Sequence, residues 1–517
     1  MRKRIKVKSG SYYDSVTLMS ISREVSQLEG IEEATLVMAT DSNLEILRDS
    51  GFESEKIEDS GPNDLIVAIK GQENQLPEAF TRVEDHLTRK KKSSETDKGK
   101  KPHSIEGALD YNPEANLVLI SVPGEFAARE ARKALEENLH VMLFSGNVSI
   151  EDEIELKEMA AERNLLMMGP DCGTAIINQK PLAFANVVES GPIGIVSASG
   201  TGAQEVSTLI QRAGVGLSQV IGTGGRDLSH RVGGLEMIKD LKALAADDST
   251  EIIVLISKPP ASQVAAKIMQ VIEKIHKPVV INFLGEQAKV GDGQEVYRAE
   301  TLQEAAFTAV NLVKEEEISP ELDSNEIEQF VEQEKQRLKT GQKYIRGLYT
   351  GGTLCSEALI LLQRRIGEIY SNIPLEDRYG LGEDLLSRQN TLLDLGEDEF
   401  TKTNPHPMID PGLRNERLRQ EIEDKETGII LADIVLGYGS HSDPAGEFAG
   451  AVKEARNRLK SENRGLSVIV SICGTEGDPQ DYQQQKEKLE NADIKVADTN
   501  VQAVKLAAEL FAGLQEG

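Results

Sequence analysis

The chain has 517 residues, with 86 acidic and 58 basic side chains, so its formal net charge is −28. This acidic balance argues against nucleic acid and anionic membranes as partners, because both are bound through basic patches. The chain has no apolar run of about 20 residues that would indicate a transmembrane helix, and its basic start lacks the apolar core of a signal peptide. We therefore expect a cytoplasmic protein.

Length and cysteine spacing bound the architecture. A chain of this length predicts about three or four domains, each able to bury a core. Its three cysteines, Cys172, Cys355 and Cys473, lie far apart and form no CxxC pair. This spacing argues against a disulfide framework and against a zinc site.

Residues 1–88 are predicted to form a small α/β domain. Strands are expected at residues 5–8, 32–38 and 65–70, and apolar residues at helical spacing predict a helix before Gly30. The segment RKKKSSETDKGKKP follows, and its charge predicts a linker over residues 89–103. A tail for nucleic acid is the alternative, which the acidic remainder of the chain disfavours.

Residues 104–185 alternate between apolar strands and helical patterns. Strands are expected at residues 117–122, 141–144 and 165–168, with helices at 125–138 and 151–163. Each strand stops in small or polar residues. Such stops are typical of the carboxyl edge of a doubly wound parallel sheet, where ligands bind.

The stretch 191–226 organises the next domain, residues 186–314. A short apolar strand runs into small residues, and Thr201 and Gln204 have capping-box spacing, so a helix is expected to start at Thr201. The free N–H groups of a helix start form a site for phosphate or carboxylate. The alternative is a tight turn that needs glycine for its geometry alone. The strands of this domain are expected at residues 193–196, 217–221, 252–256 and 278–283.

An acidic helical linker is predicted over residues 315–344, before a last domain at residues 345–517. That domain repeats the same order, with a strand, a glycine-rich turn at Gly351–Thr353 and a helix. Residues 392–411 are predicted as a polar loop, and further strands are expected at 429–438, 467–472 and 494–497. The fold class predicted for the chain is α/β, with several doubly wound, Rossmann- or flavodoxin-like, parallel-sheet domains in series.

Several motifs together resemble one superfamily. The strings VPGEF, GPDCG, VSASGTGAQE and IGTGG are similar, in order and spacing, to the α subunit of succinyl-CoA synthetase. The segment from GLYTGGTLCSEA to LLDLG resembles the ligase domain at the end of its β subunit, and DSVTLM, HPMIDP and VLGYG closely resemble FdrA-type proteins. The resemblance covers nearly the whole chain, and the joint order is far more specific than any single glycine loop. It implies a CoA-binding-like domain at 104–185 and ligase-like domains at 186–314 and 345–517.

Three departures from the ADP-forming ligases bear on mechanism. In those enzymes a histidine in a glycine-rich segment carries the phosphoryl group, whereas the corresponding FLGEQAKVGDGQEVYR has no histidine. A glutamate supports that histidine from a strand end, where this chain has Lys258. No segment resembles an ATP-grasp domain. The resemblance therefore implies that this chain cannot run the ligase cycle alone.

The resemblance to FdrA-type proteins implies a specific function. These proteins are associated with two partner proteins in the oxamate carbamoyltransferase of allantoin breakdown. We therefore expect a subunit, in an oligomer with separate protein subunits, that uses carbamoyl phosphate without a phosphohistidine. One alternative is an acyl-CoA synthetase component that needs a separate ATP-grasp subunit. Another is a non-catalytic regulator that binds CoA or a nucleotide.

The candidate site residues fall into three groups. Lys258, His406 and Asp410 are candidate catalytic residues, with a surface lysine and a loop braced by side-chain hydrogen bonds as the alternatives. CoA or another phosphate-bearing molecule is a candidate ligand, and Mg²⁺ would need only one or two carboxylates. The candidate residues for a phosphate or acyl anion are Ser199, Gly200, Thr201, Gly202, Gly351, Gly352 and Thr353. Those for a cofactor are Ser11, Pro123, Gly124, Ser145, Gly146, Pro170, Asp171 and Cys172.

Overall fold

The computed structural model describes residues 2–515 with some gaps. The gaps are residues 12, 14, 27, 41, 42, 45, 46, 49, 50, 53–56, 58, 59, 62, 63, 95–101, 286–294 and 403. The described chain divides into two compact units, residues 1–102 with 398–405 and residues 103–397 with 406–517. Most of the histidine-free segment after residue 285, and residues 95–101 of the predicted charged linker, therefore lie outside the described residues.

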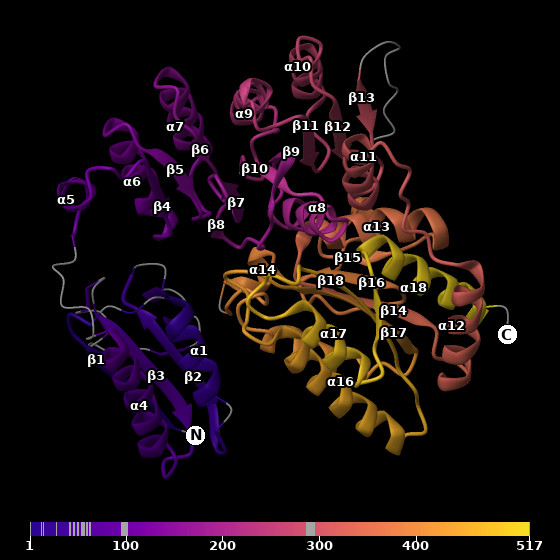
Figure 1. The fold of residues 1–517 in the computed structure, drawn as a ribbon. Coiled ribbons are helices and arrows are strands. Elements are labelled where there is room, and N and C mark those ends of the chain that lie inside the picture. Colours follow the sequence, from indigo (N-terminus) through magenta and orange to yellow (C-terminus); the bar gives the residue numbers. More distant parts are fainter. Residues whose placement is uncertain are drawn as a thin grey trace. The chain divides into compact units, whose positions relative to one another are not determined.

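The first unit is built on an antiparallel sheet of order β1-β3-β2 (Figure 1). Leu18 and Val25 from one helix, with Leu76 and Val83 from another, pack against this sheet. The second helix runs through Ser94, into the segment predicted as a linker, because arginine and lysine favour helix. The elements are β1 (Arg2–Lys8), α1 (Ser15–Ser26), β2 (Ile31–Met38), β3 (Leu65–Gly71) and α4 (Leu76–Ser94).

The second unit begins with a three-stranded parallel sheet of order β4-β5-β6. Its strands and helices lie close to the predicted positions, because each is a short apolar run or an amphipathic segment ending in small residues. The elements are α5 (Ile105–Tyr111), β4 (Leu117–Ile120), α6 (Gly124–Glu136), β5 (His140–Leu143), α7 (Ile150–Glu162) and β6 (Met167–Met168).

A seven-stranded sheet follows, of order β13-β12-β11-β9-β10-β7-β8. Its first five strands are parallel, and an antiparallel hairpin extends the edge beside β10. The elements are β7 (Thr174–Ile177), β8 (Lys180–Ala183), β9 (Ser190–Ser197), α8 (Gly200–Arg212), β10 (Leu217–Gly222), α9 (Leu235–Ala246), β11 (Ile252–Ser257), α10 (Ser262–Ile272), β12 (Val279–Phe283), β13 (Val296–Arg298) and α11 (Leu302–Lys314).

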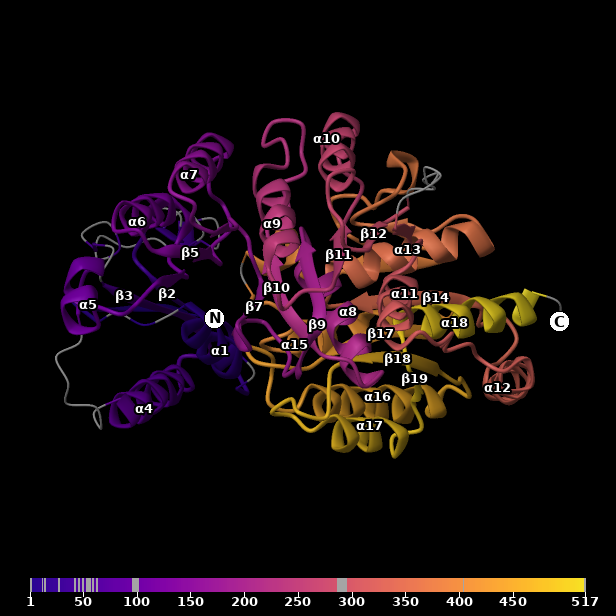
Figure 2. The ribbon, with the colours of Figure 1, turned by 45° about the horizontal axis from the view of Figure 1, so that its top comes forward.

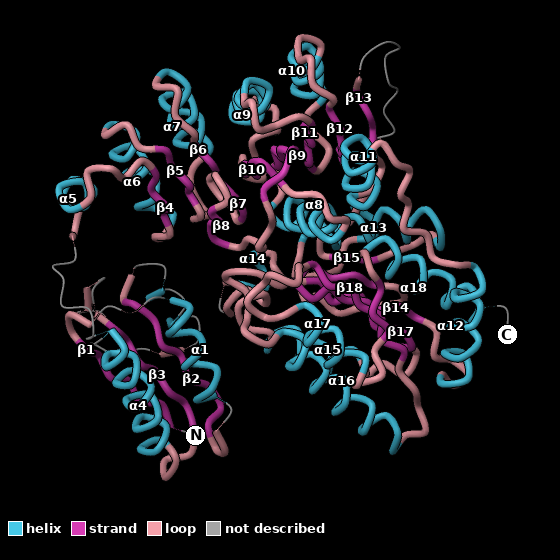
Figure 3. Tube along the Cα trace, in the orientation of Figure 1, coloured by secondary structure: helices cyan, strands magenta, loops and turns pink. Residues whose placement is uncertain are grey.

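The C-terminal part contains a six-stranded parallel sheet of order β15-β16-β14-β17-β18-β19 (Figure 3). The predicted polar loop at 392–411 begins inside β16, so that prediction was wrong for its first residues. The strands are β14 (Tyr344–Tyr349), β15 (Tyr370–Ser371), β16 (Thr391–Asp394), β17 (Thr427–Val435), β18 (Ser467–Cys473) and β19 (Lys495–Ala497). The helices are α12 (Ser324–Arg337), α13 (Gly352–Ile366), η1 (Asp377–Tyr379), α14 (Asp398–Thr401), α15 (Gly412–Glu421), α16 (Pro444–Ser461), α17 (Tyr482–Glu490) and α18 (Asn500–Gln515).

The two larger sheets share one hydrophobic core. Helices α8 and α11 cover one face of the seven-stranded sheet, and their buried side chains join those of α13 and α18 from the six-stranded sheet (Figure 2). Helices α9 and α10 cover the other face of the seven-stranded sheet around a separate core. The segment predicted as a helical linker, residues 315–344, is helical only over 324–337, the range of α12. This helix packs against α18, and its Ile327 enters the shared core.

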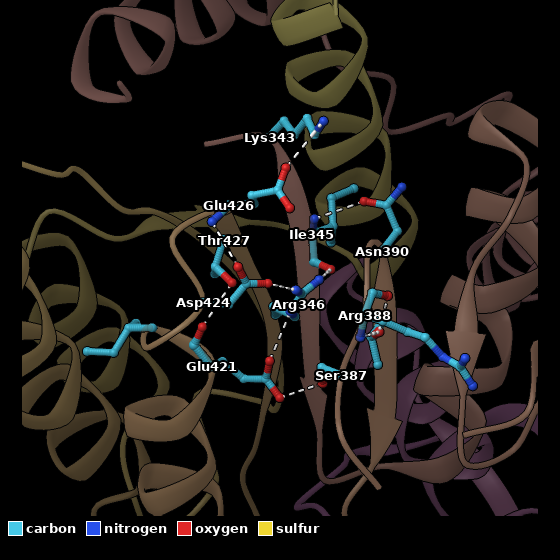
Figure 4. Close-up of polar contacts among 12 residues, drawn as sticks. Lys343, Ile345, Arg346, Ser387, Arg388, Asn390, Glu421, Asp424, Glu426 and Thr427 are labelled. Atoms are coloured by element: carbon cyan, nitrogen blue, oxygen red, sulfur yellow. Dashed lines mark hydrogen bonds and ion pairs between the residues drawn. The ribbon is translucent and has the colours of Figure 1, made fainter. Parts of the chain in front are cut away.

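The six-stranded sheet buries an arginine, Arg346, whose exposed fraction is 1% (Figure 4). Its Nε lies 2.9 Å from Glu421 Oε2, and its terminal nitrogen pairs with Asp424. Arg417 Nε donates to the other oxygen of Glu421 at 2.6 Å. These ion pairs fasten the end of α15 and the following turn to β14, which positions the strand that leads into α13.

None of the helices in the described part of the chain is long and apolar enough to cross a membrane.

Candidate functional site

The start of α8 is capped by Ser199. Its backbone is extended, with φ −144° and ψ 123°, and its Oγ accepts a hydrogen bond from Gly202 N at 2.9 Å. The helix therefore begins at Gly200, and the prediction of a capping box starting at Thr201 was wrong. Gln204, the expected partner in that box, instead donates to Asn186 Oδ1 at 3.0 Å. The N–H groups of Gly200 and Thr201 have no acceptor among the described residues, as expected for a helix start.

The start of α13 is capped by a carboxylate from the neighbouring strand. Thr350 N and Gly351 N donate to the two oxygens of Asp433 in β17, at 2.8 and 2.7 Å. Asp433 is fully buried, and burial raises the pKa of its carboxyl group, against the opposing effect of the Arg414 guanidinium. The positive end of α13 is therefore already matched by negative charge within the protein.

The two helix starts meet directly. Ser199 Oγ is hydrogen-bonded to Thr353 Oγ1, and Thr353 N donates to Thr201 Oγ1 at 3.3 Å. A Cβ atom on Gly351 would lie 3.1 Å from the Cβ of Thr201. All of the residues predicted for a phosphate or acyl anion thus belong to one cluster, which we call the paired turns (199–202 and 351–353).

A second acid, Asp394, faces the α13 half of the paired turns from the end of β16. Its Oδ1 accepts from Gly396 N at 3.0 Å, and its Oδ2 points at Gly352, where a Cβ atom would collide with it. Burial raises the pKa of this carboxyl group to about 7, and the charge of Glu397 adds to the shift. The Gly396 N–H and the Lys258 ammonium oppose it. Asp394 therefore exchanges a proton near neutral pH.

Lys258 is exposed and directly follows β11. Its positive charge acts on both Asp394 and Cys355, so it lies on the same side of the sheets as the paired turns. Two carboxyl groups, those of Asp394 and Asp433, lie at the α13 start, where Lys258 and the buried Arg414 guanidinium partly oppose their charge. The site is therefore electrically uneven, with acids at the α13 end and uncapped N–H groups at the α8 end.

His406 lies beside the same acid. A Cβ atom on Gly396 would be 2.6 Å from His406 Nε2 and 3.2 Å from Asp394 Oδ1. Met408 N donates to His406 Nδ1 at 3.2 Å, so the proton of the neutral ring sits on Nε2. Burial lowers the pKa of the imidazole to about 4. His406 is therefore a neutral hydrogen-bond donor through Nε2–H, with no lone pair there to serve as a base.

Asp410 has a structural contact in the turn that begins α15. Its Oδ1 accepts from Gly412 N at 3.0 Å, two residues further along the chain. His441, in the loop between β17 and α16, has a similar local bond, since its Nδ1 accepts from Asp443 N at 3.1 Å. Of the candidate catalytic residues, Lys258 and His406 thus neighbour Asp394, whereas the described bond of Asp410 braces its own turn.

Most of the predicted cofactor residues come together at a second place. A Cβ atom on Gly124 would collide with Gly146 O, and Asp171 N donates to Ser145 O at 3.1 Å. Pro123 caps α6 without a side-chain bond, which leaves the N–H groups of that helix start open to an anion. Binding of a CoA phosphate at these residues stays a prediction.

Cys172 contributes to that place through its backbone only. Its Sγ lies 3.4 Å from Gly222 O and 3.6 Å from Thr174 O, inside the core. Burial raises the pKa of the thiol to about 12, so it is unreactive. Ser11 belongs to the first compact unit, whereas the other predicted cofactor residues belong to the second. Within the part of the chain that the structure describes, no group of three or more His, Cys, Asp or Glu side chains is arranged for a metal ion.

Sequence reasoning missed Asp394 and Asp433. Asp394 ends an apolar strand, and Asp433 lies inside the otherwise apolar run of β17. A carboxylate within a buried strand is costly unless it is bonded, which is the signal that could have identified both.

Comparisons with known proteins assign families to three parts of the chain. Family models match residues 348–510 as CoA-ligase, 188–285 as CoA binding domain, and 1–103 as AllF, heavy metal-associated domain. The CoA binding match falls on the domain predicted as ligase-like, and the assignment of residues 104–185 to CoA stays a prediction.

The heavy metal in the last of these descriptions does not fit the residues present. Residues 1–103 contain no cysteine, and their histidines are His86 and His103. His86 Nε2 lies 2.9 Å from Glu24 Oε1. Thiophilic metal ions depend on thiolate ligands, which this domain cannot supply.

The relatives cover the chain to different extents. The uncharacterized protein YahF of Escherichia coli K12 is 43% identical over 99% of this chain and 99% of its own length. A succinate–CoA ligase α subunit of Archaeoglobus fulgidus is 28% identical over 34% of this chain and 62% of its own. A solved dinucleotide-forming acetyl-CoA synthetase 1 of Ca. Korarchaeum cryptofilum covers 80% of this chain and 85% of its own at 13% identity, and its TM-score of 0.33 is too low to equate the folds.

The near-complete match to YahF and the CoA-ligase and CoA binding domains lead to one assignment. The chain belongs to the FdrA-type proteins of the succinyl-CoA synthetase superfamily.

Proposed function

We propose that this chain is the subunit of a group-transfer enzyme that holds an acyl phosphate at the paired turns. The uneven charge of the site carries the proposal. The uncapped N–H groups of Gly200 and Thr201 suit the phosphate end of the substrate, and the proposal sets the Lys258 ammonium, whose charge also acts on Asp394, beside that phosphate. The acyl end then faces Asp394 and the neutral Nε2–H of His406.

The acids at the α13 end favour a carbamoyl group as the acyl end. An amino group can donate to the Asp394 carboxylate, whereas the second carboxylate of a succinyl group would be repelled by it. In the transfer, an acceptor nitrogen such as that of oxamate forms a bond to the carbamoyl carbon. The bond from this carbon to the phosphate oxygen breaks, phosphate leaves, and Asp394 takes the proton from the nitrogen.

The proposal needs no phosphohistidine on this chain. His406, which lies beside Asp394, carries its proton on Nε2, so that nitrogen is no nucleophile. The segment that would hold a phosphohistidine by resemblance contains none. An acyl phosphate arrives already activated, so positioning and charge stabilisation suffice for its transfer.

A component of an acyl-CoA ligase is the second candidate, and the comparisons favour it. The CoA-ligase and CoA binding family models and the succinate–CoA ligase relatives all point to CoA chemistry, and none of the relatives reported above is named as a carbamoyltransferase. The same site would then hold an acyl phosphate that CoA attacks, with ATP-grasp and histidine functions supplied by another chain. A regulator that binds such ligands without turnover is the remaining alternative.

Lys258→Met tests the placement of the phosphate. The chain and its partner subunits are assayed with carbamoyl phosphate and oxamate, and separately with succinyl phosphate and CoA. We expect turnover in the first assay, with KM for the acyl phosphate raised roughly tenfold in Lys258→Met, since one charge-assisted contact is lost. Lys274→Met, at an exposed position just after the end of α10, is the control.

The two assays separate the candidate functions. Turnover only with CoA would establish the ligase component and remove the carbamoyl proposal. Binding of carbamoyl phosphate without turnover in either assay would favour the regulator. An unchanged KM in Lys258→Met would contradict the placement of the phosphate.

The pH profile of the reaction tests Asp394. Because the pKa of this carboxyl group is raised to about 7, it is protonated below neutral pH and charged above it. The proposal uses the charged form, so kcat is expected to rise with pH and to level off above about pH 8. Asp394→Asn should lower kcat and flatten this rise, while Asp248→Asn, at an exposed position, should leave both unchanged. A profile in Asp394→Asn that still rises near pH 7 would assign the titration to another group.

A further inference from the structure

Behind the paired turns, α8 and α13 carry matched glutamates. Glu205 follows Thr201 by four residues in α8, and Glu357 follows Thr353 by four residues in α13. Their exposed fractions are 2% and 1%, and neither is ion-paired with a lysine or arginine of the described chain. Burial raises the pKa of both carboxyl groups, that of Glu357 to about 7. Two such acids need an explanation, because burying unpaired carboxyl groups is costly.

One residue, Asn500, connects the two glutamates. As the first residue of α18, it donates its backbone N–H to Glu205 Oε1 at 3.4 Å. Its Nδ2 donates to Glu357 Oε2 at 2.8 Å and to Leu354 O at 3.0 Å. Its Oδ1 accepts from Tyr349 OH at 3.2 Å. Asn500 therefore bonds at the same time to α8, to α13 and to the strand that precedes α13.

The surrounding helices support this arrangement electrostatically. The other oxygen of Glu357 accepts from Leu302 N, the first residue of α11, at 2.7 Å. Each glutamate therefore lies at the N-terminal turn of another helix, α18 for Glu205 and α11 for Glu357, where the helix dipole favours negative charge. The bonds to Glu357 are short, at 2.7 and 2.8 Å, and the bond to Glu205 is longer, at 3.4 Å. All are buried and directional, so together they fix the two helices relative to one another more strictly than apolar packing alone.

We propose that Asn500 is a positioning residue that sets the spacing between the two paired turns. It touches no substrate, and it acts through Glu205 and Glu357, which lie just over one helical turn behind Thr201 and Thr353. The catalytic consequence rests on the proposed function, whereas the effect on spacing does not.

The direct test of spacing is a disulfide between the paired turns. The hydroxyl groups of Ser199 and Thr353 touch, so Ser199→Cys with Thr353→Cys is expected to crosslink readily under mild oxidation. In the full-length chain, adding Asn500→Asp removes the donor to Glu357 and sets a third carboxyl group beside it. We expect the rate of crosslinking to fall roughly tenfold, since a buried hydrogen bond to a charged group is lost. The native cysteines are all buried.

Exchanging the two partners provides the rescue. In Asn500→Asp combined with Glu357→Gln, the glutamine amide donates to the aspartate, so this bond is reversed but kept, whereas the bond to Leu354 O is still lost. Crosslinking should therefore recover in part. Asn325→Asp, at an exposed position of α12, is the matched control for added charge. Asn500→Ser serves as a second variant if Asn500→Asp fails to fold. Crosslinking at the original rate in folded Asn500→Asp or Asn500→Ser, or no recovery in the exchange, would overturn the proposal.

Activity gives a second readout without the engineered cysteines. A positioning role predicts that Asn500→Asp lowers kcat roughly tenfold with little change in KM for the acyl phosphate, and that the exchange restores kcat in part. A purely structural role would lower the melting temperature and leave kcat of the folded enzyme unchanged. If the wild-type chain turned over no acyl phosphate, the proposed function would fail while the crosslinking result still decided the role of Asn500.

Discussion

Gly352→Ala is expected to lower the rate of group transfer by about a hundredfold, because small displacements of a reacting group cost that much. The new methyl group would collide with Asp394 Oδ2, so either the carboxylate or the first turn of α13 must move. Both belong to the acyl end of the site. The measurement is kcat with carbamoyl phosphate and with succinyl phosphate as substrates.

Two other glycines provide the comparison. A Cβ atom on Gly200 would lie 3.3 Å from Thr174 Oγ1, a tight contact that a small shift relieves, so Gly200→Ala should have a milder effect. Gly450, within α16, has open space around it, and Gly450→Ala should leave activity unchanged and stabilise the helix by about 0.5–1 kcal/mol. Equal activity in Gly352→Ala and Gly450→Ala would show that the α13 turn is not part of the reacting site.

Lys157→Met is expected to destabilise the protein by about 3–5 kcal/mol, the usual cost of leaving buried charges without their partner. Lys157 is fully buried in α7, with its Nζ 2.9 Å from Glu153 Oε1 and 2.8 Å from Asp227 Oδ1. Asp227 also accepts from Met237 N at 2.9 Å, at the start of α9. The lysine therefore joins the three-stranded sheet to the seven-stranded one, and its loss is measured as the free energy of unfolding in urea.

Matched variants separate the charge from the volume of this side chain. Lys242→Met, at an exposed position of α9, should change the free energy of unfolding by less than about 0.5 kcal/mol. Lys157→Met combined with Glu153→Gln and Asp227→Asn removes all three charges and should recover part of the loss, because neutral buried groups cost less. The recovery is incomplete because Asp227 accepts from Glu236 N and Met237 N on its two oxygens, and asparagine can accept from only one of them. Equal destabilisation by Lys157→Met and by the triple variant would attribute the effect to packing.

The sequence predicted the parallel sheets well and the pairing of other strands poorly. Strands such as β9, β11 and β12 are continuous apolar runs between small residues, a pattern that few other structures produce. The hairpin of β7 and β8 was missed, because Lys180–Ala183 contains a proline and shows no alternation. The antiparallel order of the first unit was not predicted, because strand partners far apart in the chain leave no local pattern.

The candidate site was predicted in composition but not in detail. The glycine-rich turns at 199–202 and 351–353 were recognised from order and resemblance, and they do lie together. Two features depend on tertiary contacts and were out of reach. Asp433 caps α13 from another strand, and Met408 N fixes the tautomer of His406. The functional roles of Lys258, His406 and Asp410 stay predictions.

The core shared by the two larger sheets has a consequence for assembly of the site. Both paired turns belong to a single polypeptide and to one compact unit, so they find each other at an effective concentration fixed by the fold. Formation of the site is an intramolecular event, insensitive to dilution of the chain. Substitutions on the outer surfaces, including those that contact partners, can therefore accumulate without separating the two paired turns.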